Sequence, residues 1–166
     1  MIGPSPKLEY PPLLEPGMHK LSLLEVRKMC VEGFPTSASR EDIITLLEHM
    51  FETLRLNHVI CEVWVDGSFM TRKINPGDVD LVVCLSADFA DNCYGEQQAV
   101  LDDISANLKR SGKCTRCDTF ACVVPQASDP LFKELSERVE YWKRWFGHSR
   151  SGEPKGMATV QMGEIT

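Results

Sequence analysis

The sequence contains no apolar stretch as long as a membrane-spanning helix, and its first residues lack a charged region followed by an apolar one. A bilayer span needs about 20 consecutive apolar residues, so we expect no membrane insertion. The missing secretory leader predicts a cytoplasmic protein. Internal repeats and low-complexity tracts are also absent. The 166 residues are therefore expected to fold around a single core.

Basic residues are in deficit, because 18 Lys and Arg face 24 Asp and Glu and leave a net charge of −6. A nucleic-acid binder usually carries a basic surface. The charge therefore argues against generic nucleic-acid binding and allows a small-molecule substrate, a basic partner or an RNA held by a local patch. Disulfides are not expected, because the seven cysteines are an odd number without a secretion signal.

Hydrophobic periodicity predicts alternating helices and strands. The predicted helices cover residues 22–31, 39–57, 100–112 and 130–147. The predicted strands cover residues 59–65, 79–85 and 115–124, and residues 157–162 alternate loosely, as a last edge strand would. This order predicts an α/β fold whose helices pack mainly on one face of the sheet.

The two ends of the predicted domain differ in character. Residues 1–20 hold five prolines and little periodicity, which predicts an extended N-terminal arm. Residues 21–166 are expected to form the single folded domain. Within it, residues 86–95 read as a polar loop.

The most informative stretch runs from Val65 to Val83, where a tight turn at Gly67 separates two apolar strands. Asp78 and Asp80 open the second strand. Because they lie two residues apart, both carboxylates project from the same face. Like charges on a buried sheet repel and are costly to desolvate unless a cation lies between them. A divalent cation with carboxylate, water and phosphate ligands is the usual solution.

This stretch resembles the signature of the nucleotidyltransferase (polymerase-beta-like) superfamily: an apolar residue, Gly-Ser, nine residues, then Asp-x-Asp between apolar residues. The resemblance implies a nucleotidyltransferase-like mixed sheet. It implies that Gly67 and Ser68 hold the triphosphate of an NTP, ATP included. It further implies that Asp78 and Asp80 hold two Mg²⁺ ions, together with a third carboxylate from a later strand.

The chain also resembles a family of short, stand-alone, uncharacterised nucleotidyltransferase-like proteins. Members share a Trp-Val-Asp-Gly-Ser-Phe turn, here residues 64–69, and a C-terminal Trp-Phe-Gly…Pro-Lys-Gly, here residues 145–147 and 154–156. The chain is similar, too, to minimal nucleotidyltransferases that act in toxin–antitoxin or phage-defence pairs. That likeness implies a cognate partner protein.

Asp118 is the candidate third carboxylate, because it lies in an otherwise apolar predicted strand, where a lone aspartate is unexpected. If this strand lies beside the Asp-x-Asp strand, Asp78, Asp80 and Asp118 converge. Three such carboxylates can hold two metal ions suited to in-line displacement at phosphorus, and one can act as general base for the acceptor. The alternative is a strand-end aspartate on the solvent face.

Several other polar residues have two interpretations. Arg72 and Lys73 lie between the turn and the carboxylates, as ligands of the β- or γ-phosphate or as exposed loop cations. Asp66 is a helix cap or a site residue. A basic cluster either guides an RNA backbone or forms a solvated helix end; its members are Lys109, Arg110, Lys113 and Arg116.

Together these patterns predict a Mg²⁺-dependent nucleotidyltransferase that takes an NTP, releases pyrophosphate and attaches NMP to a hydroxyl of RNA, protein or a small molecule. The alternative is a catalytically weak nucleotide-binding or protein-binding module that keeps the fold, which the intact Asp-x-Asp disfavours. Transfer to a small molecule such as an aminoglycoside is less attractive, because 166 residues leave no evident acceptor domain.

Overall fold

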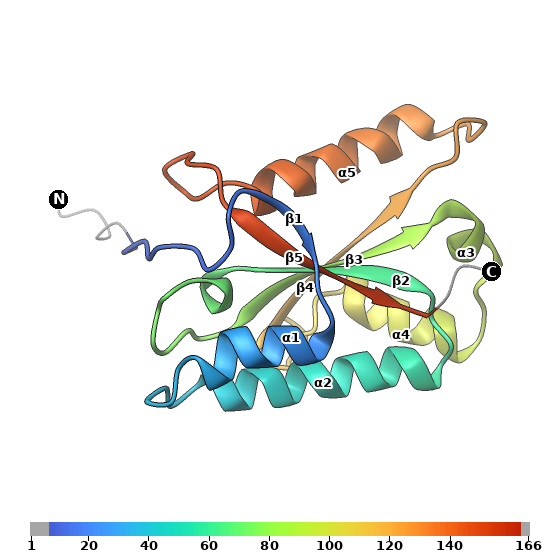
Figure 1. Ribbon diagram of the computed structural model, residues 1–166. Helices are drawn as coiled ribbons and strands as arrows, with labels where there is room; N and C mark the ends of the chain where they lie inside the picture. Colours follow the sequence, from blue (N-terminus) through green and yellow to red (C-terminus); the bar gives the residue numbers. More distant parts are fainter. Residues whose placement is uncertain (1–6, 164–166) are drawn as a thin grey trace, which may run out of the picture.

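The computed structural model describes residues 7–163, in which five strands form one sheet in the order β1-β5-β2-β3-β4 (Figure 1). The strands are β1 (Gly17–Lys20), β2 (Cys61–Asp66), β3 (Val79–Ser86), β4 (Cys117–Val124) and β5 (Gly156–Met162). β1 runs parallel to β5 and β3 parallel to β4, while β2 is antiparallel to both of its neighbours. The predicted α/β fold with a mixed sheet is confirmed.

Helices cover both faces of this sheet. The α-helices are α1 (Leu23–Arg27), α2 (Arg40–Leu56), α3 (Ala87–Asn92), α4 (Glu96–Ser105) and α5 (Phe132–Phe146). A π-helical turn, η1 (Lys28–Glu32), continues α1, and a 3-10 turn, η2 (Ser68–Met70), follows β2. In Figure 1, α1, α2 and α4 lie on one side of the sheet and α5 lies on the other. Within the described residues, no helix is both long and apolar enough to cross a membrane.

Each face of the sheet has its own hydrophobic core, because successive strand residues point to opposite faces. Val63 and Leu81 belong to the larger core with residues of α1, α2 and α4. Trp64 and Val82, one position further along, belong to the smaller core under α5. Burial on both faces explains why these strands read as continuous apolar runs.

Three local predictions differ from the structure. β5 lies between β1 and β2, so it is an interior strand rather than the expected edge strand. Its alternation is loose because Met157, Ala158 and Val160 are all buried, on two different faces. Residues 17–20, expected in the arm, form the edge strand β1. Part of the expected polar loop is helix α3, started by Ser86, whose hydroxyl accepts the Phe89 N–H at 3.1 Å.

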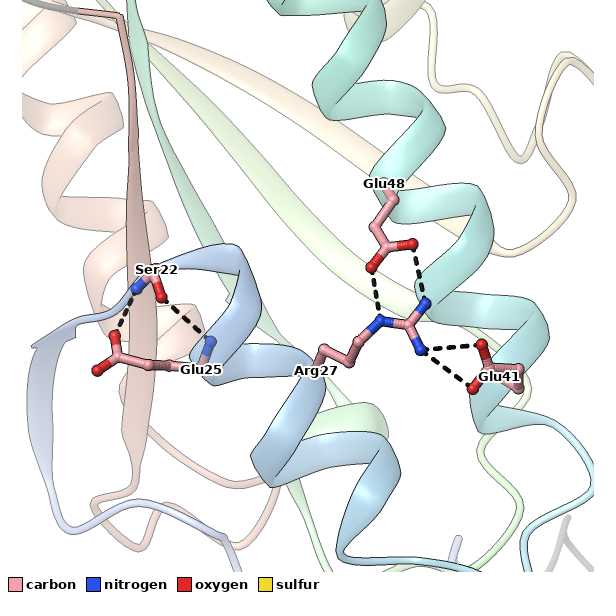
Figure 2. A network of polar contacts seen from close by, with 5 residues as sticks. All are labelled: Ser22, Glu25, Arg27, Glu41 and Glu48. Atoms are coloured by element: carbon pink, nitrogen blue, oxygen red, sulfur yellow. Dashed lines mark hydrogen bonds and ion pairs between the residues drawn. The ribbon is translucent and has the colours of Figure 1, made fainter.

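A charged network joins α1 to α2 (Figure 2). The predicted capping box is present: the Ser22 hydroxyl accepts the Glu25 N–H at 3.1 Å, and the Glu25 carboxylate accepts the Ser22 N–H at 2.7 Å. Two residues after Glu25, the Arg27 guanidinium donates to both oxygens of Glu48, at 2.7 and 2.9 Å, and to Glu41 at 2.9 Å. This two-sided fork fixes how α1 lies against α2.

Arg40, the first residue of α2, is fully buried and organises the loop that follows β2. Its guanidinium is bound by backbone carbonyls rather than by a carboxylate, and among the described residues it has no ion pair. The accepting carbonyls, with their distances, are Cys30 (2.8 Å), Phe69 (2.7 Å), Thr71 (2.6 Å) and Lys73 (2.6 Å). A planar group with five donors is suited to gather carbonyls in this way.

Replacing Arg40 by Met should lower the free energy of unfolding by at least about 3 kcal/mol, because several buried carbonyls lose their donors at once. Arg40→Lys should also destabilise, since an ammonium cannot reach the same set of carbonyls. Urea denaturation measures both effects. The matched control is Arg55→Met, which removes an exposed arginine whose partner, within residues 7–163, is Glu52, and should cost less than about 1 kcal/mol. Equal losses at positions 40 and 55 would contradict the role given to Arg40.

Candidate metal centre

A row of aspartates crosses three adjacent strands at one end of the sheet. Strand pairing places Asp66 of β2 opposite Asp80 of β3, and Asp80 opposite Asp118 of β4. The next residues on the same face, Trp64 and Val82, belong to the core under α5. The acidic row therefore continues the α5-covered face of the sheet beyond its apolar part.

Asp78, which immediately precedes β3, completes a cluster with Asp80 and Asp118. One carboxylate oxygen from each residue lies within 4.8 Å of the others, and all three side chains are partly exposed. Oxygens at this separation can share a cation with bonds of about 2.0–2.6 Å. The structure thus brings the three candidate ligands together. It also places the strand of Asp118 beside the Asp-x-Asp strand, as expected.

The ionised form of Asp80 is disfavoured within this cluster. Burial, followed by repulsion from Asp78 and Asp118, raises the pKa of Asp80 to about 6. The charges of Lys155 and Lys109 act in the opposite direction. A bound divalent cation would relieve the same repulsion far more strongly than the single charge of a lysine.

Lys109, from the predicted basic cluster, points into the site. Its Nζ forms an ion pair with Asp78 Oδ2, and this bond raises the pKa of Lys109. The charges of Asp118 and Asp80 act on Lys109 in the same direction. The ammonium therefore contacts Asp78 and is attracted by the charges of the other two carboxylates. The basic cluster had two interpretations, and that of a solvated helix end does not describe Lys109, because Lys109 pairs with Asp78.

Asp66 forms a second, more deeply buried ion pair. Lys155 Nζ lies 2.8 Å from Asp66 Oδ2, and the two side chains are 16% and 5% exposed. Burial raises the pKa of Asp66 to about 7 although the ammonium opposes this shift. The other oxygen, Oδ1, is buried without a hydrogen-bond partner among the described residues. The sequence allowed Asp66 to be a helix cap or a site residue. No side chain caps η2, so the role of helix cap is not observed.

The Gly67-Ser68 turn passes directly over Asp80. Gly67 has a φ of +84°, and a Cβ at this position would lie 2.5 Å from Asp80 Oδ2. Only glycine fits such an approach and such a backbone conformation. Ser68 begins the short η2 turn. A ligand held by this turn would therefore adjoin the carboxylate cluster.

Asn107, which the sequence analysis did not single out, orients the third carboxylate. It is buried, with a φ of +72°, in the connection from α4 to β4. Its Nδ2 donates to Asp118 Oδ1 at 2.5 Å, and its Oδ1 accepts the N–H groups of Lys109 and Arg110 at 3.1 and 3.2 Å. The predicted helix over residues 100–112 encloses Asn107, whereas α4 ends at Ser105. The only sequence signal for this break is the asparagine itself, because asparagine tolerates the left-handed conformation.

Arg72 and Lys73 are not brought to the carboxylates. Among the described residues neither forms an ion pair with the cluster. Lys73 Nζ lies 5.9 Å from the centre of the Tyr10 ring. Arg72 is exposed, and its backbone N–H donates to the Pro11 carbonyl at 2.9 Å. Their roles as phosphate ligands remain predictions.

Lys155→Met should lower the free energy of unfolding at pH 8 by about 3–5 kcal/mol, because it leaves a buried carboxylate without its cation. The double variant Asp66→Asn, Lys155→Met should recover most of this loss. Chemical denaturation of the two variants measures the difference. Lys143→Met, which removes an exposed pair with Glu140 on α5, is the control. A double variant no more stable than the single one would refute the pairing argument.

Metal-free stability should respond to pH through Asp80. Its folded-state pKa of about 6 lies above the usual 3.8. Between these two pH values, Asp80 is protonated in the folded chain and ionised in the unfolded chain. The resulting stabilisation is complete below pH 4 and is lost as pH rises through about 6. In EDTA, Asp80→Asn should therefore gain in melting temperature relative to wild type between pH 5 and pH 8, by a few degrees. A constant difference across that range would contradict the raised pKa.

Comparison with known proteins identifies a family match. The family described as "Family of unknown function (DUF6932)" matches residues 6–161. No curated protein and no solved structure matches the chain. The matched segment includes all four aspartates of the site, both lysines paired with them, and Asn107. Because the match covers most of the sequence, the chain belongs to this family, DUF6932.

Proposed function

We propose that this protein is a Mg²⁺-dependent nucleotidyltransferase that transfers NMP from an NTP to a hydroxyl of RNA, protein or a small molecule. The observation that carries the proposal is the convergence of Asp78, Asp80 and Asp118 within 4.8 Å. It is supported by the Gly67 turn, which passes so close to Asp80 that a side chain is excluded. Both features belong to the superfamily signature that the sequence resembles.

The donor set fits Mg²⁺, because it consists of carboxylate oxygens whose mutual repulsion a hard dication relieves. Asp78, Asp80 and Asp118 would hold two ions, with water and phosphate as further ligands. When bound, the ions supply charge neutralisation at the phosphates and activation of the acceptor hydroxyl. The partly exposed side chains leave one side of the cluster open to substrate.

Residues of this chain bind the substrate and position the carboxylates. Gly67 and Ser68 bind the triphosphate through the turn, and Asn107 keeps Asp118 in place. In the transfer, the acceptor oxygen bonds to the α-phosphorus while the bond from that phosphorus to the bridging oxygen breaks. Pyrophosphate leaves, and a carboxylate of the cluster accepts the hydroxyl proton.

A second candidate function is a protein-binding module that keeps the fold, favoured by two exposed aromatic rings on α5. Tyr141 and Trp145 are 46% and 64% exposed, and their ring centres lie 6.3 Å apart in a stacked arrangement. Large exposed aromatics are typical of interaction surfaces. This surface is also where a cognate partner would bind if the protein acts in a toxin–antitoxin or phage-defence pair.

The deciding experiment incubates the protein with each labelled NTP, Mg²⁺ and cell extract, and follows label transfer and pyrophosphate release. Asp78→Asn, Asp80→Asn and Asp118→Asn should each lower transfer at least about 100-fold, since each removes a metal ligand. Asp91→Asn, at an exposed aspartate of α3, is the matched control and should retain full activity. Unchanged transfer by Asp80→Asn would refute the proposal.

Thermal shifts separate the two candidates. A transferase should be stabilised by NTP with Mg²⁺ and much less by NTP with EDTA, because binding to the folded state is then metal-dependent. Equal shifts in both conditions, without pyrophosphate release, would favour the binding module.

A further inference from the structure

Lys109 binds a carboxylate for which a metal ion would have to compete. Its ammonium pairs with Oδ2 of Asp78, a residue expected to bind metal, and the charges of Asp80 and Asp118 also act on it. An ammonium is a weak substitute for a divalent cation, because it carries half the charge and no vacant coordination site. A cation that binds Asp78 must therefore displace Lys109 or be repelled by it.

The lysine can be displaced without a change in the fold. Its side chain is 44% exposed and that of Asp78 is 23% exposed, in contrast to the locked pair of Asp66 and Lys155. Surface pairs of this kind contribute little to stability. Breaking the contact with Asp78 therefore costs the folded protein little.

The backbone that carries Lys109 is fixed, so only its side chain can move. The Lys109 N–H donates to Asn107 Oδ1 at 3.1 Å, and the neighbouring Leu108 N–H donates to the Thr119 hydroxyl at 2.9 Å. Thr119 is fully buried in β4, next to Asp118. A displaced ammonium would consequently stay near the partly exposed carboxylate cluster, within reach of an anionic ligand bound beside it.

We propose that Lys109 is an exchangeable cation of this site: it pairs with Asp78 in the metal-free protein, and it pairs with the phosphates of the bound nucleotide once metal takes Asp78. The first half concerns metal binding alone. The second half rests on the proposed function, because it requires a polyphosphate ligand. Lys109 is thus a competitor for metal and a ligand for substrate, and its removal should affect the two affinities in opposite directions.

The first measurement is calorimetric titration of the full chain with Mg²⁺ or Mn²⁺ alone. Lys109→Ala should bind the metal about tenfold more tightly than wild type, equivalent to about 1.4 kcal/mol, because a competing cation is gone. Lys113→Ala is the matched control: it lies in the same connection but pairs with Asp103 at 2.6 Å, so its metal affinity should not change. Unchanged or weaker metal binding by Lys109→Ala would overturn the inference.

The second measurement uses tripolyphosphate at saturating Mg²⁺, which presents the phosphates without a base. Lys109→Ala should bind it about tenfold more weakly, the effect of one lost charge-assisted contact. Lys109→Arg should restore most of this affinity, whereas a merely structural role would not be rescued in this way. The proposal fails if Lys109→Ala binds both metal and tripolyphosphate more tightly than wild type. It also fails if both affinities are unchanged.

Failure of this inference and failure of the proposed function give different results. If wild type transfers NMP but Lys109→Ala leaves both affinities unchanged, the lysine inference alone is overturned. If wild type binds Mg²⁺ but neither tripolyphosphate nor any NTP, the phosphate half falls together with the proposed function.

Discussion

The geometry of the site depends on a buried guanidinium that touches none of its carboxylates. Arg40 binds the carbonyls of Phe69, Thr71 and Lys73, which belong to the loop between the Gly67 turn and Asp78. The far part of this loop is also tied to the start of α2, where Asn75 Oδ1 accepts the Ala38 N–H at 2.7 Å. The residues around the N-terminus of α2 therefore set the path by which the chain leaves Asp66 and returns to Asp78.

The N-terminal arm holds the same loop from outside. The Leu13 N–H donates to the Met70 carbonyl, and the Pro11 carbonyl accepts the Arg72 N–H, both at 2.9 Å. Held between the arm and α2, the loop keeps Gly67 against Asp80, a contact that tolerates no side chain. The proline-rich start of the chain thus contributes to the site by packing rather than by chemistry.

The parts of the site that the sequence could predict are local. The Gly67-Ser68 turn, the Asp-x-Asp pair and the apolar strands could be recognised from spacing and alternation, and the polarity of Asp118 singled it out within its strand. Pairing of β3 with β4 then brings Asp118 opposite Asp80. The turn and the Asp-x-Asp pair depend on residues close together in the chain, whereas the meeting of Asp80 and Asp118 depends on the pairing of β3 with β4.

The residues that the sequence did not reveal act across the fold. Lys155 meets Asp66 only because β5 lies beside β2, and no local pattern marks a lysine in a turn as a buried partner. Asn107 matters through a side-chain contact with the next strand, and Arg40 through carbonyls of a later loop. The position of β5 inside the sheet was missed for the same reason: pairing order is a tertiary property, and both of its faces are buried.

The end of the sheet that carries the aspartates is unfavourable for anions, because its two lysines, Lys109 and Lys155, are already paired with aspartates. α4 ends just before Asn107, and α5 ends at Gly147, whose carbonyl accepts the Lys155 N–H at 2.9 Å. Both helices therefore direct the negative ends of their dipoles towards the acidic row. Sites in parallel α/β sheets usually lie at the opposite, carboxyl ends of the strands, where helix N-termini attract phosphate. A nucleotide could bind here only with added positive charge, and Lys109, once displaced from Asp78, would supply a single unit of it. This electrostatic balance is the strongest physical reason to propose that a phosphate ligand would bind at this site through divalent metal.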